Sequence, residues 1–177
     1  CAKKNPEFWL IGPGNQDSKN TNYKHNSIIE VENIKGFAIF FNMKKFNEIF
    51  FDENYFLYFE EIDLCKKVLD QKGKIFLDKN ININHMGGSS VNLKFKEELE
   101  KNRNWHWMWS TFYFHKKYKG SLFALQIILP KLLSSLLRII YYQLVLNNKK
   151  RNIYFYRLSG IINSIVGKKS WYRPTLD

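Results

Sequence analysis

Residues 121–146 read SLFALQIILPKLLSSLLRIIYYQLVL, and a helix this rich in apolar residues must be covered by other protein or by lipid. Pro130, Lys131 and Arg138 interrupt the run, so no stretch of about 20 uncharged residues is left to span a bilayer. We therefore expect helices that lie on a membrane or on a protein surface, and not a simple transmembrane helix.

The polar residues inside this run follow a helical period. They form one narrow stripe on an otherwise apolar helix: Lys131, Ser134, Ser135, Arg138 and Tyr142. Basic clusters stand at both ends of the run, and tryptophans and tyrosines precede it, a combination typical of membrane surfaces. The residues expected to face the membrane are Lys131, Arg138, Trp105, Trp107 and Trp109. Packing of two helices on the domain, or on a second copy of the chain, is the alternative interpretation.

The charge balance favours anionic partners. The sequence has 28 Lys and Arg against 16 Asp and Glu, and its net charge of +12 attracts polyanions or anionic lipid head groups. Its two cysteines, Cys1 and Cys65, are too few and too far apart for a disulfide framework, which favours a reducing compartment such as the cytoplasm. The chain starts with Cys1 and not with Met, and it opens like a mid-domain loop, so we expect a preceding portion to be missing.

The first 90 residues alternate short strands and helices. The stretches FWLI, GFAIFF and KIFLDKNININH have the apolar, β-branched or alternating character of strands. Helical spacing is found in MKKFNEIF, residues 43–50, and again from Phe59 to Gly73, where Gly73 stands at the position of a left-handed C-terminal cap. This order predicts an α/β or α+β architecture.

The second helix opens with an acidic cluster in YFEEIDLCKK: Glu60, Glu61 and Asp63. A helix N-terminus stabilises acids by itself, so capping and solvation is the plain interpretation. Several aromatic residues surround the cluster, however, and would partly desolvate a carboxylate and raise its basicity, as a general base requires.

A histidine and a small-residue turn follow the expected extended segment. His85 ends that segment, and the turn behind it could approach a phosphate with its backbone N–H groups through Gly87, Gly88 and Ser89. A lone histidine is more often structural than a ligand. Together with the acids, it predicts a metal-and-phosphate corner next to a base.

Several ordered motifs resemble one protein family. GFAIFF, FDENYFLYFEEIDLCKK, a glycine with a strand, and HMGGSS are similar in order and spacing to the second half of the catalytic domain of inverting family 2 glycosyltransferases, especially the rhamnosyltransferase-like branch. WSTFYFHKKYKG and RLSGIINSIVGKKSWYRP resemble the membrane-associated C-terminal extension of that family. The resemblance implies the acceptor-side half of a nucleotide-diphospho-sugar transferase fold over residues 1–92 and an amphipathic helical extension over residues 93–177.

The resemblance also implies roles for residues. Glu61 stands at the position of the general base, and Glu60 and Asp63 stand at the flanking positions that orient the acceptor and the helix. His85 corresponds to a histidine that helps hold a divalent cation, Mg or Mn, on the donor diphosphate. Lys67 replaces the usual Arg, and no D-x-D motif occurs in the sequence, so the chain alone is not expected to bind a sugar nucleotide productively.

The implied activity is transfer of a sugar, such as rhamnose, from a nucleotide-sugar donor to a saccharide or lipid-linked acceptor with inversion. It would serve bacterial surface polysaccharide synthesis at the inner face of the cell membrane, with no nucleic acid as partner. Two alternatives stay open. One is a non-catalytic nucleic-acid-binding module that stacks bases on Trp and Tyr and tracks phosphates with basic residues. The other is a membrane-anchoring remnant of a glycosyltransferase.

Overall fold

The computed structural model describes residues 9–13, 28–42, 51–85 and 95–174. The chain divides into two units. The sheet unit is Cys1–Asp52 with Glu60–Gly87, and the helical unit is Glu53–Phe59 with Gly88–Asp177. The helical unit therefore includes a short segment, residues 53–59, that the sequence analysis assigned to the catalytic half.

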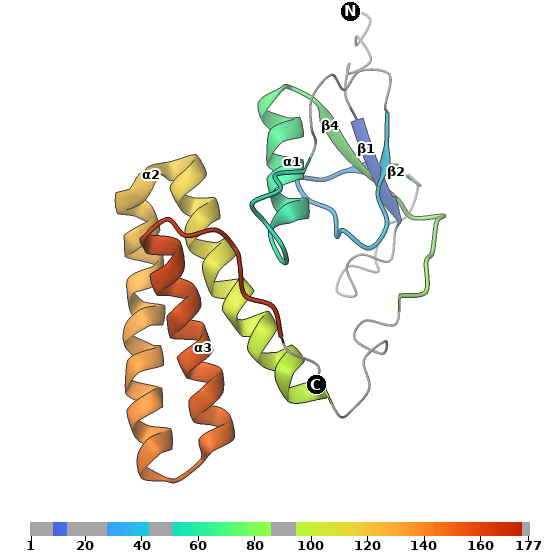
Figure 1. Ribbon diagram of the computed structural model, residues 1–177. Coiled ribbons are helices and arrows are strands. Elements are labelled where there is room, and N and C mark those ends of the chain that lie inside the picture. The colour runs from blue at the N-terminus through green and yellow to red at the C-terminus, as the bar shows by residue number, and fades with distance from the viewer. Residues whose placement is uncertain (1–8, 14–27, 43–50, 86–94, 175–177) are drawn as a thin grey trace, which may run out of the picture. The chain divides into compact units, whose positions relative to one another are not determined.

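The sheet unit contains a mixed sheet of four strands in the order β2-β4-β1-β3 (Figure 1). The strands are β1 (Trp9–Pro13), β2 (Ile28–Glu30), β3 (Phe40–Phe41) and β4 (Lys74–Asp78). β1 and β4 run parallel, with Leu10 opposite Ile75, and the two outer strands are antiparallel to their neighbours. Ile75 and Leu77 of β4 are buried, as its alternating pattern predicts.

Two expected strands are shorter than the sequence indicates. Of GFAIFF, only Phe40 and Phe41 pair with β1, because Gly36 and Phe37 form a turn before them. The extended segment ends its ladder at Asp78, and residues 81–85 continue without strand pairing. The helix expected at residues 43–50 lies outside the described residues.

Helix α1 (Glu60–Asp70) packs on the sheet as a second layer of this core. Its inner face buries Leu64, Cys65 and Val68 at i, i+1 and i+4, a stripe of the kind that packs on a sheet. These side chains cluster with three others from the rest of the unit: Leu10, Ile34 and Ile75. Burial raises the pKa of the Cys65 thiol, as expected for an unreactive core cysteine.

The C-terminal cap of α1 differs from the expectation by one residue. Lys72 has the left-handed φ of 60°, and Gly73 follows it with its N–H donating to the Val68 carbonyl at 2.8 Å. The Lys72 N–H donates to the Leu69 carbonyl at 2.9 Å, which completes a Schellman motif. The conformation predicted for Gly73 is therefore adopted by Lys72.

The helical unit is built from α2 (Lys96–Leu144) and α3 (Asn148–Ile165). α2 reverses at Gly120, whose φ of 82° and ψ of 167° suit only glycine. We call residues 96–119 the first arm and residues 121–144 the second arm. Figure 1 shows the two arms running antiparallel, with α3 beside them.

The reversal at Gly120 brings the two arms of α2 together, and side chains from both arms form the core of the helical unit. Met108 and Phe112 of the first arm cluster with Ala124 and Ile128 of the second. Ile161 of α3 completes the cluster. The preceding residue of α3 is Gly160, where an added Cβ would lie 2.3 Å from the Trp105 carbonyl oxygen, so α3 and the first arm approach too closely for any larger residue.

The second arm turns its polar stripe toward α3. Arg138 donates to the Tyr154 hydroxyl at 2.6 Å, Tyr142 stacks on the same ring at 5.6 Å between centroids, and Ser135 is buried. The apolar side chains point outward and are between 38% and 80% exposed: Leu122, Leu125, Leu129, Leu133, Leu136, Leu137, Ile140 and Leu144. By length and composition alone, α2 contains a stretch apolar enough to cross a membrane.

A buried histidine fastens the segment after α3 to the first arm. Nε2 of His106 lies 2.9 Å from the Tyr172 carbonyl oxygen, and Nδ1 lies 2.8 Å from the Ser170 hydroxyl. A carbonyl can only accept, so the neutral ring carries its proton on Nε2 and accepts from Ser170 at Nδ1. Burial, with a smaller contribution from the charge of Arg173, lowers the pKa of His106 to about 4.

Residues 53–59 also pack on the first arm. Asn54 Nδ2 donates to the Tyr113 hydroxyl at 3.1 Å, and the Ser110 hydroxyl donates to the Leu57 carbonyl at 3.0 Å. Tyr58 and Phe59 both pack against the ring of Trp107, with centroids 5.1 and 5.4 Å away. The segment is therefore held along its length by one helix.

The His106 contacts predict an acid-sensitive helical unit. The unfolded chain, with a histidine pKa near 6.5, takes up a proton at a higher pH than the folded state does. Stability should therefore fall as the pH drops from 6.5 toward 4, by up to about 1.4 kcal/mol per pH unit. Urea unfolding of the wild type and of His106→Gln at pH 7 and pH 4.5 measures this loss.

His106→Gln keeps a donor for the Tyr172 carbonyl but does not titrate, so its acid-induced loss should be smaller. His85→Gln, at an exposed histidine, is the matched control and should behave as the wild type. An equal loss in the wild type and in His106→Gln would contradict the assignment.

Candidate functional site

The start of α1 fixes the position of the acidic cluster. Tyr58 and Phe59 have left-handed φ values of 67° and 72°, which no α-helix can continue, so the helix begins at Glu60. Glu60, Glu61 and Asp63 thus occupy its first turn, as the sequence predicts. Two consecutive aromatic residues in this conformation cost roughly 1–3 kcal/mol each, so the surrounding packing must hold them.

Asp63 differs from its two neighbours because it is fully buried. Its carboxylate forms an ion pair with Lys67, one turn further along α1, with 3.2 Å between Nζ and Oδ2. A carboxylate in this position cannot reach a substrate from solvent. Its position favours a structural role in orienting the helix, which is one of the two roles that the resemblance implies for the flanking acids.

Glu61 packs over the turn that precedes β3. A Cβ added to Gly36 would lie 3.4 Å from the Cβ of Glu61, so the glycine leaves room for the glutamate. One carboxylate oxygen of Glu61, Oε2, is buried and has no hydrogen-bond partner among the described residues, and the same is true of Oε2 of Glu60. A buried acceptor without a donor costs about 1–3 kcal/mol, which a bound donor would recover.

Burial raises the pKa of Glu60. The carboxylate's hydrogen bond to its own backbone N–H opposes this, and the nearby charge of Glu61 adds to it. The expected increase in carboxylate basicity is therefore found at Glu60. A carboxylate with a raised pKa is a common component of acid and base chemistry.

His85 packs against the same turn, at residues 36 and 37, as Glu61 does. Its ring is exposed and stacks on Phe37, with centroids 4.9 Å apart and an angle of 6° between the planes. Because Glu61 contacts Gly36 and His85 contacts the next residue, the fold brings the two predicted site residues to one turn of the sheet unit. The sequence analysis missed the contribution of Gly36 and Phe37, since it assigned GFAIFF to a strand.

A divalent cation does not fit the described residues by themselves. No three His, Cys, Asp or Glu side chains in the described part of the chain are grouped to hold a metal ion. His85 offers one ligand, whereas Mg²⁺ takes six. The phosphate-binding turn with Gly87, Gly88 and Ser89 lies outside the described residues.

The expected membrane-facing residues divide into two groups. Trp105 and Trp109 are 0% and 3% exposed and belong to the interior of the helical unit, because both rings pack in the cluster that includes Tyr172. The surface is reached by Trp107 and Arg138, and Lys131 is half-buried. The two buried tryptophans are therefore removed from the expected membrane-facing set.

Comparison with known proteins adds no assignment. No protein-family model matches the chain, and neither curated proteins nor solved structures provide a similar one.

The burial of the acids predicts opposite effects on stability. Asp63→Asn should lower the free energy of unfolding by about 2–4 kcal/mol, because it leaves the half-buried Lys67 without its charged partner. Glu61→Gln should leave it unchanged or slightly raised, because it removes a charge with a buried, unpartnered oxygen. Urea titrations of both variants provide the comparison, and equal losses would refute this division of roles.

Proposed function

We propose that the chain contributes the acceptor-side part of an inverting glycosyltransferase that works at an anionic membrane surface. The observation that supports this most is that Glu61 and His85 both pack against the turn at Gly36 and Phe37, and that one carboxylate oxygen of Glu61 has no hydrogen-bond partner among the described residues. An acceptor hydroxyl is the kind of hydrogen-bond donor that this oxygen lacks. The order of the motifs in the sequence supports the same reaction.

In the proposed reaction, the hydroxyl oxygen of the acceptor attacks the anomeric carbon of the donor. A carboxylate oxygen of Glu61 accepts the hydroxyl proton during this attack. The bond from this carbon to the nucleotide diphosphate breaks on the opposite face, so the configuration inverts. Glu60, whose pKa is raised by burial, holds a proton more readily than an ordinary glutamate. The divalent cation and the nucleotide-sugar donor remain predictions from the resemblance.

The charge distribution supports the proposed membrane surface. The sheet unit has 12 Lys and Arg against 11 Asp and Glu, whereas the helical unit has 16 against 5. From Lys101 to Pro174 there are 14 basic residues and no acidic residue. Each Lys or Arg near an anionic surface contributes about 1 kcal/mol to binding, so the helical unit is the part that such a surface attracts.

The outward leucines of the second arm also support a location at a membrane surface. Lys131 and Arg138 lie in the middle of this arm, and a charge at the centre of a bilayer costs roughly 2.5–3.5 kcal/mol. An arm lying in the plane of the interface avoids this cost while its leucines enter the lipid. A nucleic-acid-binding function has less support, because Trp105 and Trp109 are buried and offer no stacking surface.

The catalytic proposal predicts a specific loss of transfer. In the natural protein that contains this chain, Glu61→Gln should lower the rate of sugar transfer by about 10²–10⁴-fold while nucleotide-sugar binding is unchanged. Asp70→Asn, at an exposed acid near the other end of α1, is the control and should retain activity. Transfer at the wild-type rate by Glu61→Gln would reject Glu61 as the base.

The membrane proposal predicts lipid binding through the second arm. Flotation with phosphatidylglycerol vesicles should recover the wild-type chain, and Leu133→Ser combined with Leu137→Ser should weaken binding roughly 30-fold, because two half-exposed leucines no longer enter lipid. Gln126→Ser, an exposed polar position of the same arm, should bind as the wild type. If the leucine pair has no effect, the apolar face does not contact lipid.

A further inference from the structure

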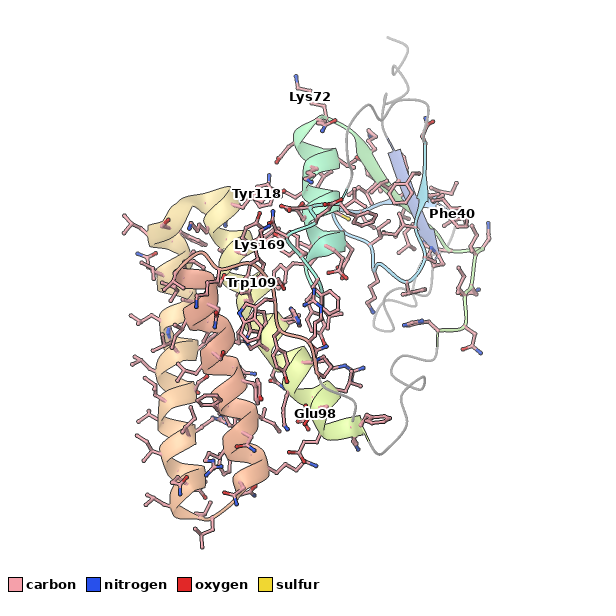
Figure 2. All side chains as sticks on the ribbon, viewed as in Figure 1. Phe40, Lys72, Glu98, Trp109, Tyr118 and Lys169 are labelled. Atoms are coloured by element: carbon pink, nitrogen blue, oxygen red, sulfur yellow. The ribbon has the colours of Figure 1, made fainter. Side chains whose placement is uncertain are left out.

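The helical unit contains a basic pocket whose lining shares no residue with the outward leucines of the second arm. Its volume is about 370 Å³, within the range of ligand sites. Two aromatic side chains and four lysines define its character: Trp109, Tyr113, Lys116, Lys117, Lys168 and Lys169. Figure 2 shows Lys169 and Tyr118 at the end of the unit opposite Glu98.

The polar groups of the pocket wall are already paired with one another. Trp109 Nε1 donates to the Lys168 carbonyl at 2.9 Å, and Tyr113 accepts from Asn54 at 3.1 Å. The two rings stack with centroids 4.9 Å apart and 20° between their planes. The wall is therefore rigid, and the charge of the pocket comes from lysine ammonium groups, each with three hydrogen-bond donors.

The lysines come from two segments that are far apart in the sequence. Lys116 and Lys117 stand in the last turn of the first arm, and Lys168 and Lys169 follow α3. The second pair is held by the turn at Gly167, whose φ is 77° and whose N–H donates to the Ser164 carbonyl at 3.1 Å. Packing of α3 on the first arm brings the two pairs to one pocket.

The negative ends of the two helix dipoles offset only part of the positive charge of the lysines. The C-terminus of a helix is equivalent to about −0.5 charge, so the two helix ends at the pocket supply about −1 against four lysines. None of the residues lining the pocket is acidic. The described lining of the pocket therefore has a net positive charge, and Lys117 also lies over the rings of Tyr55 and Tyr118.

We propose that this pocket binds a phosphate-bearing group. A phosphate or diphosphate is attracted by this positive lining and offers several strong acceptors to lysine donors. The volume also leaves room for the group attached to the phosphate, which can lie against the aromatic rings. The source is either a lipid head group or a free diphosphate. The inference does not depend on glycosyl transfer or on the leucine face.

The test compares two pairs of lysines in the full chain. Lys116→Gln with Lys169→Gln removes two charges at the pocket, and Lys149→Gln with Lys150→Gln removes two exposed charges at the start of α3. Binding of inorganic pyrophosphate is measured by calorimetry, and binding of phosphatidylglycerol vesicles is measured by flotation. A lysine contributes about a factor of five, so the pocket pair should weaken binding ~25-fold.

The soluble and the lipid probe distinguish the two sources. Loss of pyrophosphate binding in the pocket pair alone supports the site with a free diphosphate as ligand. Loss of vesicle binding beyond that of the control pair, without a pyrophosphate effect, supports a lipid head group. Equal effects of the two pairs on both probes would overturn the proposal, because general positive charge would then explain binding.

Charge-preserving variants separate binding from folding. Lys116→Arg with Lys169→Arg should bind both probes as the wild type does. Both positions are exposed, so the glutamine variants should retain the wild-type unfolding curve. A loss of binding in the arginine variants as large as that in the glutamine variants would contradict a site that acts through positive charge, and full binding in all of them would exclude the site.

Discussion

The second arm of α2 directs Arg138 and Tyr142 toward Tyr154 of α3 and leaves most of its leucines outside, whereas Leu132 packs on the hairpin core. This arrangement reverses the usual distribution for a soluble protein, in which large apolar patches are covered. The hairpin core, the contact of Gly160 with the first arm and the histidine-held segment after α3 together position this face. A surface of this kind, in a unit with a strong positive charge, is suited to an anionic bilayer.

In the sheet unit, the proposed site residues Glu61 and His85 both pack against the turn at Gly36 and Phe37. A single glycine makes room for Glu61, and the next residue supports the ring of His85. Asp63, only two residues beyond Glu61, is closed off and paired within the helix. Three neighbouring acids thus have different environments, and the difference follows from 3.6 residues per turn. One acid points into the core while the other two remain near the surface.

The sequence was sufficient for the elements whose period is set by burial. β1, β4, α1 and the helical character of the tail all follow from apolar spacing, and so does the position of the acids in the first turn of α1. The sequence was not sufficient where tertiary packing decides the backbone conformation of a residue or the direction in which its side chain points. A polar stripe can face water or a neighbouring helix, and only the position of Tyr154 shows which. The turn at Gly36, the cap at Lys72 and the burial of Trp105 have the same cause.

The lysine pocket is a second feature that could not be predicted from the sequence. Each lysine pair looks like an ordinary helix end, and the two pairs are separated by about 50 residues in the sequence. Their joint charge exists only after α3 has folded back on the first arm. A site made from distant, individually unremarkable residues gives no local motif.

Gly120 has a wider consequence for the architecture of the helical unit. Both arms are helical up to this single residue, and its backbone angles are available to glycine alone. With any other residue at this position, α2 would favour one continuous helix of 49 residues, about 74 Å long. The second arm and α3 would then leave their own first arm and could pack on that of another molecule. One glycine thus separates a hairpin closed within one chain from exchange of helices between two copies.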